Sequence, residues 1–369
     1  MTVRSAVARR APGKLFVAGE YAVMEPGHPA ILVAVDRHVH VTVSAAEGAD
    51  TVVVSDLRPG EVRLRRQAGR PAADAGAPGS GGLRHVLSAI DVVGALLAER
   101  GTDVPPIRVS ISSGLHRNGT KLGLGSSGAV TVATVDAVAA YCGLELSPGA
   151  RFRLAMLATA RIEAGSSGGD LAAGVWGGWI EYRAPDRAAV LDLVRRRGVE
   201  ETLRAPWPGF AVRPLPPPRG LTLEVAWTGR PVRTASLTGR LGRRGWQGST
   251  AQGSFLARSD NCVGAAVRAL GQGDDQALLR QVGDARRLLA ALDDEVGLGI
   301  FTPRLTALCD AAEAVGGAAK PSGAGGGDCG IALLDATAEA EISLLREKWT
   351  AAGLLPVPIS ITSTKGSTE

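Results

Sequence analysis

The sequence predicts an α+β fold made of two domains. Its 369 residues are 45% hydrophobic and 21% charged, a composition typical of a folded chain. Such a length accommodates two domains of roughly 150–200 residues each. Strand-like and helical segments are mixed along the chain, so each half is expected to hold a sheet with helices on one side. A proline-dense segment at 205–219 separates the halves, and we place an N-terminal domain at 1–210 and a C-terminal domain at 220–369.

In the N-terminal half, the spacing of apolar residues predicts the helices and strands, and glycines mark where they end. Apolar residues at helical spacing mark a helix that ends at a glycine, and β-branched runs mark strands. The predicted elements, in order, are strands within 11–45 with a turn at Pro26-Gly27, a loop over 67–82, a helix over 83–100, a strand over 107–112, a helix opening from the glycine loop at 123–128 and stopping near Gly143, a helix at about 149–164, and a strand over 175–183.

The C-terminal half shows the same mixture after the proline-dense connector. The predicted elements are a strand over 221–229, a glycine- and arginine-rich loop over 239–254, helices at about 255–271, 274–292 and 302–316, a strand over 330–334, a helix over 336–352 and a short strand over 357–361. Arg243 and Arg244 in the loop are candidates for a phosphate clamp or lid, and a solvated loop is an equally good interpretation.

Composition and charge exclude several classes of protein. Apolar content is too high for disorder, no apolar run reaches the roughly 18 residues of a membrane span, and the N-terminus lacks the apolar core of a secretory signal. Four scattered cysteines without CxxC spacing favour a reduced, cytoplasmic protein without structural zinc. A net charge of +5 with only 4% aromatic residues does not indicate nucleic-acid binding, so we expect small-molecule partners and no membrane partner.

Lysine is rare in this chain, and its positions are therefore informative. Only five lysines accompany 36 arginines, and three of the five, Lys14, Lys121 and Lys320, lie in or beside glycine-rich segments. Since the compact ammonium and the planar guanidinium interact differently with their surroundings, these three lysines are candidates for a specific role.

Four glycine-rich segments carry the candidate chemistry. The loop Gly123-Leu124-Gly125-Ser126-Ser127-Gly128 precedes a helix, and backbone amides at a helix start attract anions, although a simple serine-capped helix is the competing interpretation. The segment from Lys320 to Asp328 contains glycine or alanine at five successive positions, which favours close backbone approach to a ligand. Asp170 follows Ser166-Ser167-Gly168-Gly169 on a predicted turn, and Lys14 follows Pro12-Gly13 at the start of a strand.

Taken together, these segments resemble the GHMP kinase superfamily and, within it, the phosphomevalonate kinase family. The resemblance rests on PGKLFVAGEYAV, KLGLGSSGAV, SSGGDLAA followed by GGWIEY, and KPSGAGGGDCGIAL, in that order, together with AWTGRPVRT at 226–234. It covers residues from about 11 to 334 and both expected domains. It implies an N-terminal domain like ribosomal protein S5 domain 2, a ferredoxin-like C-terminal domain, and ATP with Mg²⁺ in the cleft between them.

The resemblance also implies residue roles. The phosphates of ATP would lie on Gly123–Gly128, with Ser127 as a ligand of Mg²⁺. Asp170 and Lys121 would be catalytic, and Lys14 would be catalytic and bind the acceptor phosphate. Ser167, Gly168 and the turn Ser322, Gly323, Ala324 and Gly325 would bind the substrate. In mevalonate kinases a glutamate eleven residues before the aspartate also binds Mg²⁺; Thr159 occupies that position here, and Glu163 is too near Asp170 in sequence to be equated with it.

The implied activity is phosphorylation of (R)-5-phosphomevalonate by ATP to (R)-5-diphosphomevalonate, in the mevalonate pathway of isoprenoid biosynthesis. The alternatives are mevalonate kinase, diphosphomevalonate decarboxylase or another small-molecule kinase of the superfamily, and a non-catalytic ligand sensor on the same fold. The sequence leaves open the oligomeric state and whether Asp328 contacts the ligand or only holds its own turn.

Overall fold

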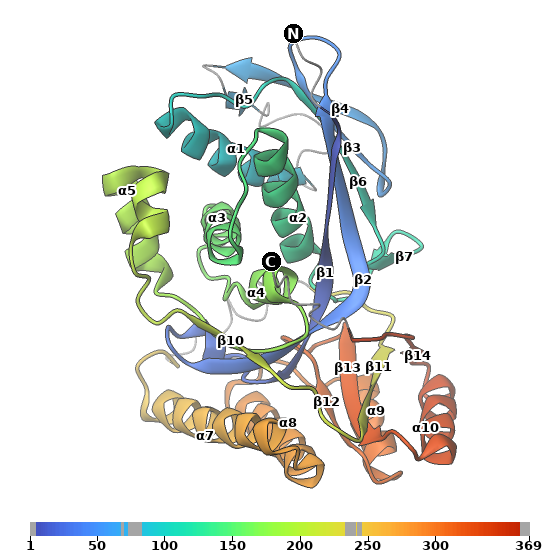
Figure 1. Cartoon of the computed structure of the whole chain (residues 1–369). Helices are drawn as coiled ribbons and strands as arrows, with labels where there is room; N and C mark the ends of the chain where they lie inside the picture. The colour runs from blue at the N-terminus through green and yellow to red at the C-terminus, as the bar shows by residue number, and fades with distance from the viewer. Residues whose placement is uncertain (1–4, 68–69, 73–82, 233–240, 242–245, 362–369) are drawn as a thin grey trace.

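The computed structural model describes residues 5–67, 70–72, 83–232, 241 and 246–361. Two sheets organise this part of the chain, a large one from the N-terminal half and a small one from the C-terminal half (Figure 1). Arg243 and Arg244, the candidate clamp residues, lie outside the described residues, as does most of the predicted loop over 67–82.

The large sheet has eight described strands and runs in the order β10-β9-β2-β6-β3-β4-β5, with β1 paired to β2 beside this path. A short hairpin of β7 and β8 lies next to it. The long strand β2 pairs with β1, β6 and β9, and is therefore a central strand of the sheet. The bounds are β1 Val7–Ala18, β2 Pro29–Ala45, β3 Thr51–Ser55, β4 Arg58–Gln67, β5 Arg70–Ala72, β6 Ile107–Ser113, β7 His116–Arg117, β8 Thr120–Lys121, β9 Trp179–Arg183 and β10 Ala211–Leu215.

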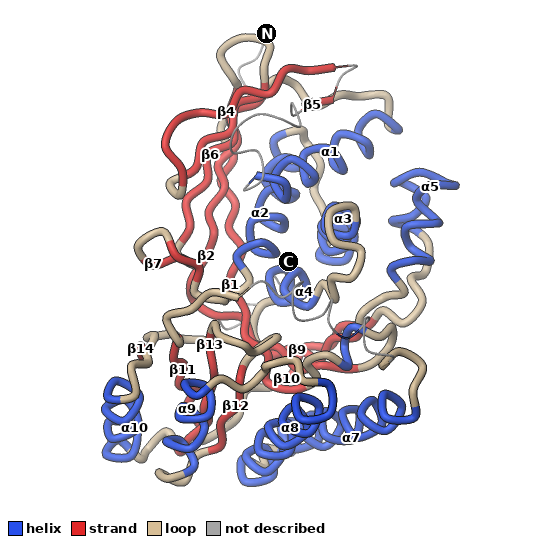
Figure 2. Tube along the Cα trace, turned by 180° about the vertical axis from the view of Figure 1, so that it is seen from behind, coloured by secondary structure: helices blue, strands red, loops and turns tan. Residues whose placement is uncertain are grey.

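Helices of the N-terminal half gather on one face of this sheet, as the two opposite views show (Figures 1 and 2). The central helix α2 is buried over most of its surface, because the sheet covers one side and α1, α3 and α4 cover the others. Its alanine, valine and threonine side chains suit this fully enclosed position. The bounds are α1 Arg84–Glu99, α2 Ser126–Tyr141, α3 Pro148–Ala160, α4 Gly169–Trp176 and α5 Arg187–Arg204, with a short 3₁₀ helix η1 at Ala22–Met24.

The small sheet has the order β12-β13-β11-β14 among the described strands, and all its pairs are antiparallel. Strands and helices follow one another as expected for a ferredoxin-like domain, with extra helices before β12. Trp349 on α10 is fully buried and donates through its indole nitrogen to the Leu308 carbonyl of α9 at 3.0 Å. The bounds are β11 Leu221–Trp227, α7 Thr250–Gln272, α8 Asp275–Val296, α9 Pro303–Glu313, β12 Ala318–Pro321, β13 Cys329–Asp335, α10 Glu339–Ala351 and β14 Leu355–Pro356.

The two halves share an apolar core. Helices α7 and α8 pack against the ends of β1, β2 and β10, and Figure 1 shows them beneath the large sheet. One continuous cluster of buried residues joins Leu15 and Leu32 of the first half to Val225 and Leu333 of the second. No helix of the described residues combines the length and apolarity needed to span a membrane.

The structure corrects several predicted elements. Residues 175–176 end helix α4 rather than begin a strand, because the Gly-Gly pair at 177–178 adopts positive φ and separates helix from strand. The proline-dense connector contains β10, which tolerates Pro214 because it is the edge strand of its sheet. The last strand lies at 355–356 rather than 357–361, and helix α3 stops at Ala160.

Candidate active site

Strand β1 carries Lys14 into the space between the two halves. The backbone nitrogen of Lys14 donates to the Leu124 carbonyl at 2.8 Å, which joins the strand to the glycine loop. Only a glycine fits at position 13, since a Cβ there would lie 2.7 Å from the same carbonyl oxygen. The Lys14 side chain is 8% exposed and its ammonium lies 5.2 Å from the centre of the Phe16 ring. No carboxylate among the described residues forms an ion pair with it.

The loop at 123–128 opens helix α2 with free backbone amides. Gly123 and Gly125 both have φ of 78°, and Gly125 is the N-cap residue. The first intrahelical hydrogen bond runs from the Ala129 nitrogen to the Gly125 carbonyl at 3.1 Å, which leaves the three preceding amides without helical partners. No serine side chain caps this helix. The competing interpretation, a serine-capped helix, is therefore wrong, and the geometry suits an anion.

Asp170 lies in the first turn of α4 and faces the start of α2. The sequence placed it on a turn; the helix begins one residue earlier, at Gly169, with Gly168 as a left-handed N-cap residue. A Cβ on Gly128 would lie 2.3 Å from Asp170 Oδ2, so the carboxylate occupies the space that a side chain at 128 would fill. Burial raises the pKa of Asp170 above its ordinary value, and the charges of Lys14 and His85 oppose that shift.

Lys14 lies between the glycine loop, Asp170 and the turn of the other half. A Cβ on Gly125 would be 3.2 Å from Lys14 Cε and 3.2 Å from Asp170 Cβ. A Cβ on Gly323 would be 3.8 Å from Lys14 Nζ. The structure therefore brings together four segments, of which the first and last lie more than 300 residues apart in the sequence.

The turn at 322–325 is held by backbone and side-chain contacts to the first half. The Ser322 hydroxyl accepts from the Phe16 nitrogen at 2.8 Å and donates to the Phe16 carbonyl at 3.1 Å. The Tyr21 hydroxyl donates to the Ala324 carbonyl at 2.5 Å. Gly325 has φ of 74°, and a Cβ there would lie 2.5 Å from a side-chain carbon of Ile300. The Ser322 side chain thus serves the joint between the halves, and its neighbouring backbone faces Lys14.

Asp328 fastens its own turn and packs on the glycine loop. Its Oδ1 accepts from the Val232 nitrogen at 3.0 Å, and its own backbone nitrogen donates to the Arg230 carbonyl at 2.8 Å. A Cβ on Gly123 would lie 2.4 Å from Asp328 Cβ. Next to it, the Cys329 thiol donates to the Leu122 carbonyl at 2.9 Å. The question left by the sequence is thereby resolved in part: Asp328 holds the turn and joins it to the loop.

The remaining predicted residues lie at different depths. Lys121 is an exposed residue of β8. Burial raises the pKa of Asp328, and the charges of Lys14 and Lys121 oppose that rise. Ser167 precedes α4, where its hydroxyl accepts from the Gly169 nitrogen at 3.3 Å and its carbonyl accepts from Tyr182 at 2.5 Å. Gly168 is closely packed, since a Cβ there would lie 2.5 Å from the Met156 sulfur.

His85, at the start of α1, is a neighbour of the site that the sequence did not point out. Its Nδ1 lies 3.5 Å from the Thr131 hydroxyl of α2. Burial lowers the pKa of His85, and the charges of Asp170 and Glu163 raise it. A lone histidine at a helix start has no spacing signal, so only the fold could place it near Asp170.

The residues present suit a magnesium nucleotide rather than a protein-bound metal cluster. Among the described residues, no three His, Cys, Asp or Glu side chains gather to hold a metal ion. The Ser127 hydroxyl at the start of α2 and the Asp170 carboxylate facing it are hard oxygen donors, which Mg²⁺ prefers alongside phosphate oxygens. Thr159 is buried and its hydroxyl has no partner in the described structure, while Glu163 is exposed. Neither supplies a buried carboxylate in the place where mevalonate kinases have a glutamate.

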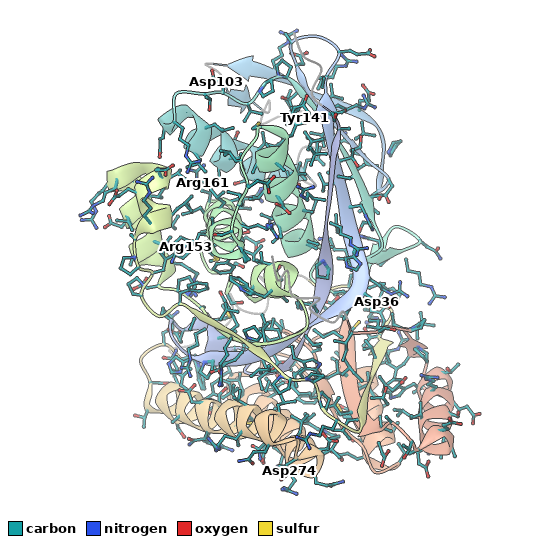
Figure 3. The ribbon with its side chains drawn as sticks, in the orientation of Figure 1. Asp36, Asp103, Tyr141, Arg153, Arg161 and Asp274 are labelled. Atoms are coloured by element: carbon teal, nitrogen blue, oxygen red, sulfur yellow. The ribbon has the colours of Figure 1, made fainter. Side chains whose placement is uncertain are left out.

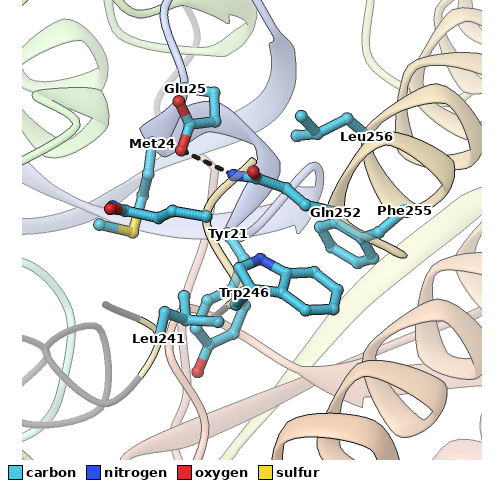
Figure 4. Close-up of a pocket in the computed structure, with 9 residues that line it drawn as sticks. Tyr21, Met24, Glu25, Leu241, Trp246, Gln252, Phe255 and Leu256 are labelled. Carbon is cyan, nitrogen blue, oxygen red and sulfur yellow. Dashed lines mark hydrogen bonds between the residues drawn. The ribbon is translucent and has the colours of Figure 1, made fainter. Parts of the chain in front are cut away.

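Two cavities lie close to these segments without containing the predicted catalytic residues. One, of about 60 Å³, lies between η1 and the start of α7 (Figure 4). Gln252 donates to Glu25 across it at 3.0 Å, and Trp246 and Phe255 form part of its wall. The other, of about 250 Å³, lies behind the 326–327 backbone beside Arg304.

Charged side chains are spread over the molecule instead of forming one basic face. The residues labelled in Figure 3 come from separate parts of the chain: Asp36 is on β2, Arg153 is on α3, and Asp103 and Asp274 lie between elements. Many arginines are neutralised locally, as in the bidentate pair of Arg346 with Glu224 at 2.8 Å.

The comparisons with known proteins place this site in a family. The family model for the GHMP kinases N terminal domain matches residues 84–178, and the model for the GHMP kinases C terminal domain matches residues 266–351. The fold and the site together therefore define a small-molecule kinase of the GHMP class.

Similar proteins show to which family of GHMP kinases the chain belongs. The phosphomevalonate kinase of Streptomyces sp. strain CL190 is 62% identical over 97% of this chain and 98% of its own. The structure of Streptococcus pneumoniae phosphomevalonate kinase in complex with phosphomevalonate and AMPPNP aligns with a TM-score of 0.84 and 28% identity, covering 96% of this chain and all of that one. Mevalonate kinases are more distant, with 29% identity to the enzyme of Thermococcus onnurineus over 88% of this chain and 87% of that enzyme. The chain belongs to the phosphomevalonate kinase family.

Proposed function

We propose that this protein transfers the γ-phosphoryl group of ATP to the phosphate of (R)-5-phosphomevalonate and forms (R)-5-diphosphomevalonate. The reaction is a step of the mevalonate pathway of isoprenoid biosynthesis. Its close curated relative is a phosphomevalonate kinase, and a similar solved structure contains phosphomevalonate and AMPPNP.

One observation carries the proposal most directly: Lys14 is a nearly buried cation that forms no ion pair among the described residues, although its charge acts on the nearby Asp170 carboxylate. It lies between the free amides of the glycine loop and the 322–325 turn. Since a buried charge is costly unless it is paired, such a cation is suited to binding a phosphate that arrives with the substrate.

The acceptor chemistry explains why cations matter more than a base. The second pKa of a phosphate monoester is about 6, so the acceptor is mostly a dianion at neutral pH and needs little deprotonation. Two unit charges about 4 Å apart repel by about 4 kcal/mol at an effective dielectric constant of about 20, and several such pairs meet here. Lys14, Lys121 and the amides of α2 are the groups that would offset this repulsion.

In this proposal each predicted residue has a distinct task. The amides of Gly123 to Gly128 bind the nucleotide phosphates, and the 322–325 backbone together with Ser167 and Gly168 borders the acceptor. Ser127 and Asp170 would hold Mg²⁺, which when bound neutralises phosphate charge. Asp170 also holds Lys14 in place through its charge, and acts as a base only secondarily.

Two alternatives remain to be separated by experiment. A non-catalytic sensor is disfavoured because the aspartate, both loop serines and the lysines are all present. A mevalonate kinase is disfavoured by the lower identity of those relatives and by Thr159 in place of a carboxylate.

An ADP-release assay with mevalonate, phosphomevalonate and diphosphomevalonate in parallel tests the proposal. We expect ATP to be turned over to ADP with phosphomevalonate and with neither of the other two compounds. Turnover with mevalonate instead, or none with any of the three, would contradict it.

The proposal includes two further points. The two sheets support a division into two domains, but β10 (Ala211–Leu215) pairs with β9 of the first sheet, so the first domain extends past the proposed limit at 210 to Leu215, and the second stays at 220–369. A cytoplasmic location is supported by the four cysteines, which form no disulfide.

A further inference from the structure

A buried ion pair links the two halves directly beside the acceptor turn. Lys320 on β12 is fully buried, Glu20 after β1 is 3% exposed, and the Lys320 ammonium donates to Glu20 Oε1. The same ammonium donates to the Pro321 carbonyl at 2.7 Å. Neither residue belongs to the phosphoryl-transfer machinery described above, so the pair needs its own explanation.

The pair is the centre of a set of contacts that fix the 322–325 turn. Glu20 Oε1 also accepts from the Gly323 nitrogen at 3.4 Å. On either side, Ser322 is bonded to the Phe16 backbone and Tyr21 to the Ala324 carbonyl. Glu20 and Tyr21 follow directly on the strand that carries Lys14. The ion pair therefore ties the acceptor turn to the Lys14 strand.

Stability alone does not account for this arrangement. Burying both charges carries a large desolvation cost, and a well-packed apolar pair is often as stable. Glu20 Oε2 is also buried and has no hydrogen-bond partner in the described structure, which adds to that cost. A hydrogen-bonded ion pair, by contrast, is directional, so it restricts the position of the 322–325 turn more closely than an apolar contact would.

We propose that Lys320 and Glu20 are positioning residues, which hold the 322–325 turn at a fixed place relative to Lys14 and so set the position of phosphomevalonate for transfer. The proposal rests on the proposed function for the identity of the acceptor. The placement of the turn itself does not depend on that identity.

The test uses the full-length protein and a variant that removes both charges, Glu20→Gln with Lys320→Met. Lys320→Met alone would leave the buried Glu20 charge unpaired and would destabilise the protein for that reason. The double change removes both charges and avoids this effect. Arg286→Met is the matched control, because Arg286 joins α8 to Asp310 and Glu313 on α9 within the C-terminal half.

We expect the double variant to raise the KM for phosphomevalonate by about tenfold or more while the KM for ATP changes by less than about threefold. Hydrogen exchange of the 322–325 amides should become about tenfold faster, with exchange in α2 unchanged. The control should leave both KM values and this exchange as in the unchanged protein.

A folded double variant with unchanged KM for phosphomevalonate and unchanged exchange at 322–325 overturns the proposal. So does a double variant that fails to fold, since the pair would then serve folding alone. If the unchanged protein does not phosphorylate phosphomevalonate, the proposed function fails, and the exchange measurement still decides whether the pair holds the turn.

Discussion

Two buried lysines of this chain differ in one respect that decides their interpretation. Lys320 forms an ion pair with Glu20, whereas Lys14 forms no ion pair among the described residues. The first cation is therefore neutralised within the protein, and in the proposed function the second binds a phosphate of the substrate. In a chain that uses arginine almost everywhere, both buried positions keep the compact ammonium of lysine, which differs from the planar guanidinium in size and in hydrogen-bond geometry.

For single residues of the site, we predict that Lys14→Ala and Lys121→Ala reduce kcat at least as strongly as Asp170→Asn, by about 10²-fold or more. The physical reason is that a dianionic acceptor requires neutralised charge more than it requires a base. Steady-state assays of the three variants with phosphomevalonate and ATP measure this. Loss of activity in Asp170→Asn alone, with both lysine variants largely active, would show that proton removal governs the reaction.

Two helices of the N-terminal half begin in the same way and face each other. Both α2 and α4 start from a glycine in the left-handed region, and neither has a side-chain cap. The missing side chain at Gly128 in the first turn of α2 makes room for Asp170 in the first turn of α4. In the proposed function, this pair of helix starts would set the distance between the nucleotide phosphates and the Asp170 carboxylate.

From this packing we predict that Gly128→Ala lowers kcat by about 10²-fold, because the new methyl group displaces the Asp170 carboxylate by an ångström or more. Gly253→Ala is the matched control, since Gly253 also lies in the first turn of a helix, α7, and has open space around it. The control should keep its activity and gain about 1 kcal/mol of stability from helix propensity. Equal activity in the two variants would contradict the packing argument.

The two sheets of the molecule share one apolar core. The core cluster runs from strands of the first half to strands and helices of the second. Polar contacts at Glu20, Ser322 and Cys329 cross the same boundary. Separating the halves would expose apolar surface on both sides and break these contacts together.

We therefore predict a single thermal transition in scanning calorimetry, with a ratio of calorimetric to van't Hoff enthalpy of about one. Shared burial makes each half depend on the other. Two resolved transitions, or an independently folded fragment of residues 1–210, would mean that the boundary contributes little to stability.

The parts of the fold that follow from local pattern were predicted well. The β-branched runs gave strands β1 and β2, and the apolar spacing gave α1 and α2 with nearly correct ends. Helix α4 was missed because its two glycines and short length resemble a turn, and β10 because proline usually marks a connector. The segments of the site could be found from glycine and lysine usage. The contacts of His85, Glu20 and Asp328 could not, because they depend on how distant segments pack.

The Cys329 thiol has a practical consequence. It is fully buried at the boundary and bonded to the Leu122 carbonyl, and burial raises the pKa of the thiol. An alkylating reagent can reach this sulfur as a thiolate only in molecules whose two sheets have moved apart. The rate at which Cys329 is alkylated therefore measures how often the two halves separate. Mass spectrometry can follow this rate without an added label.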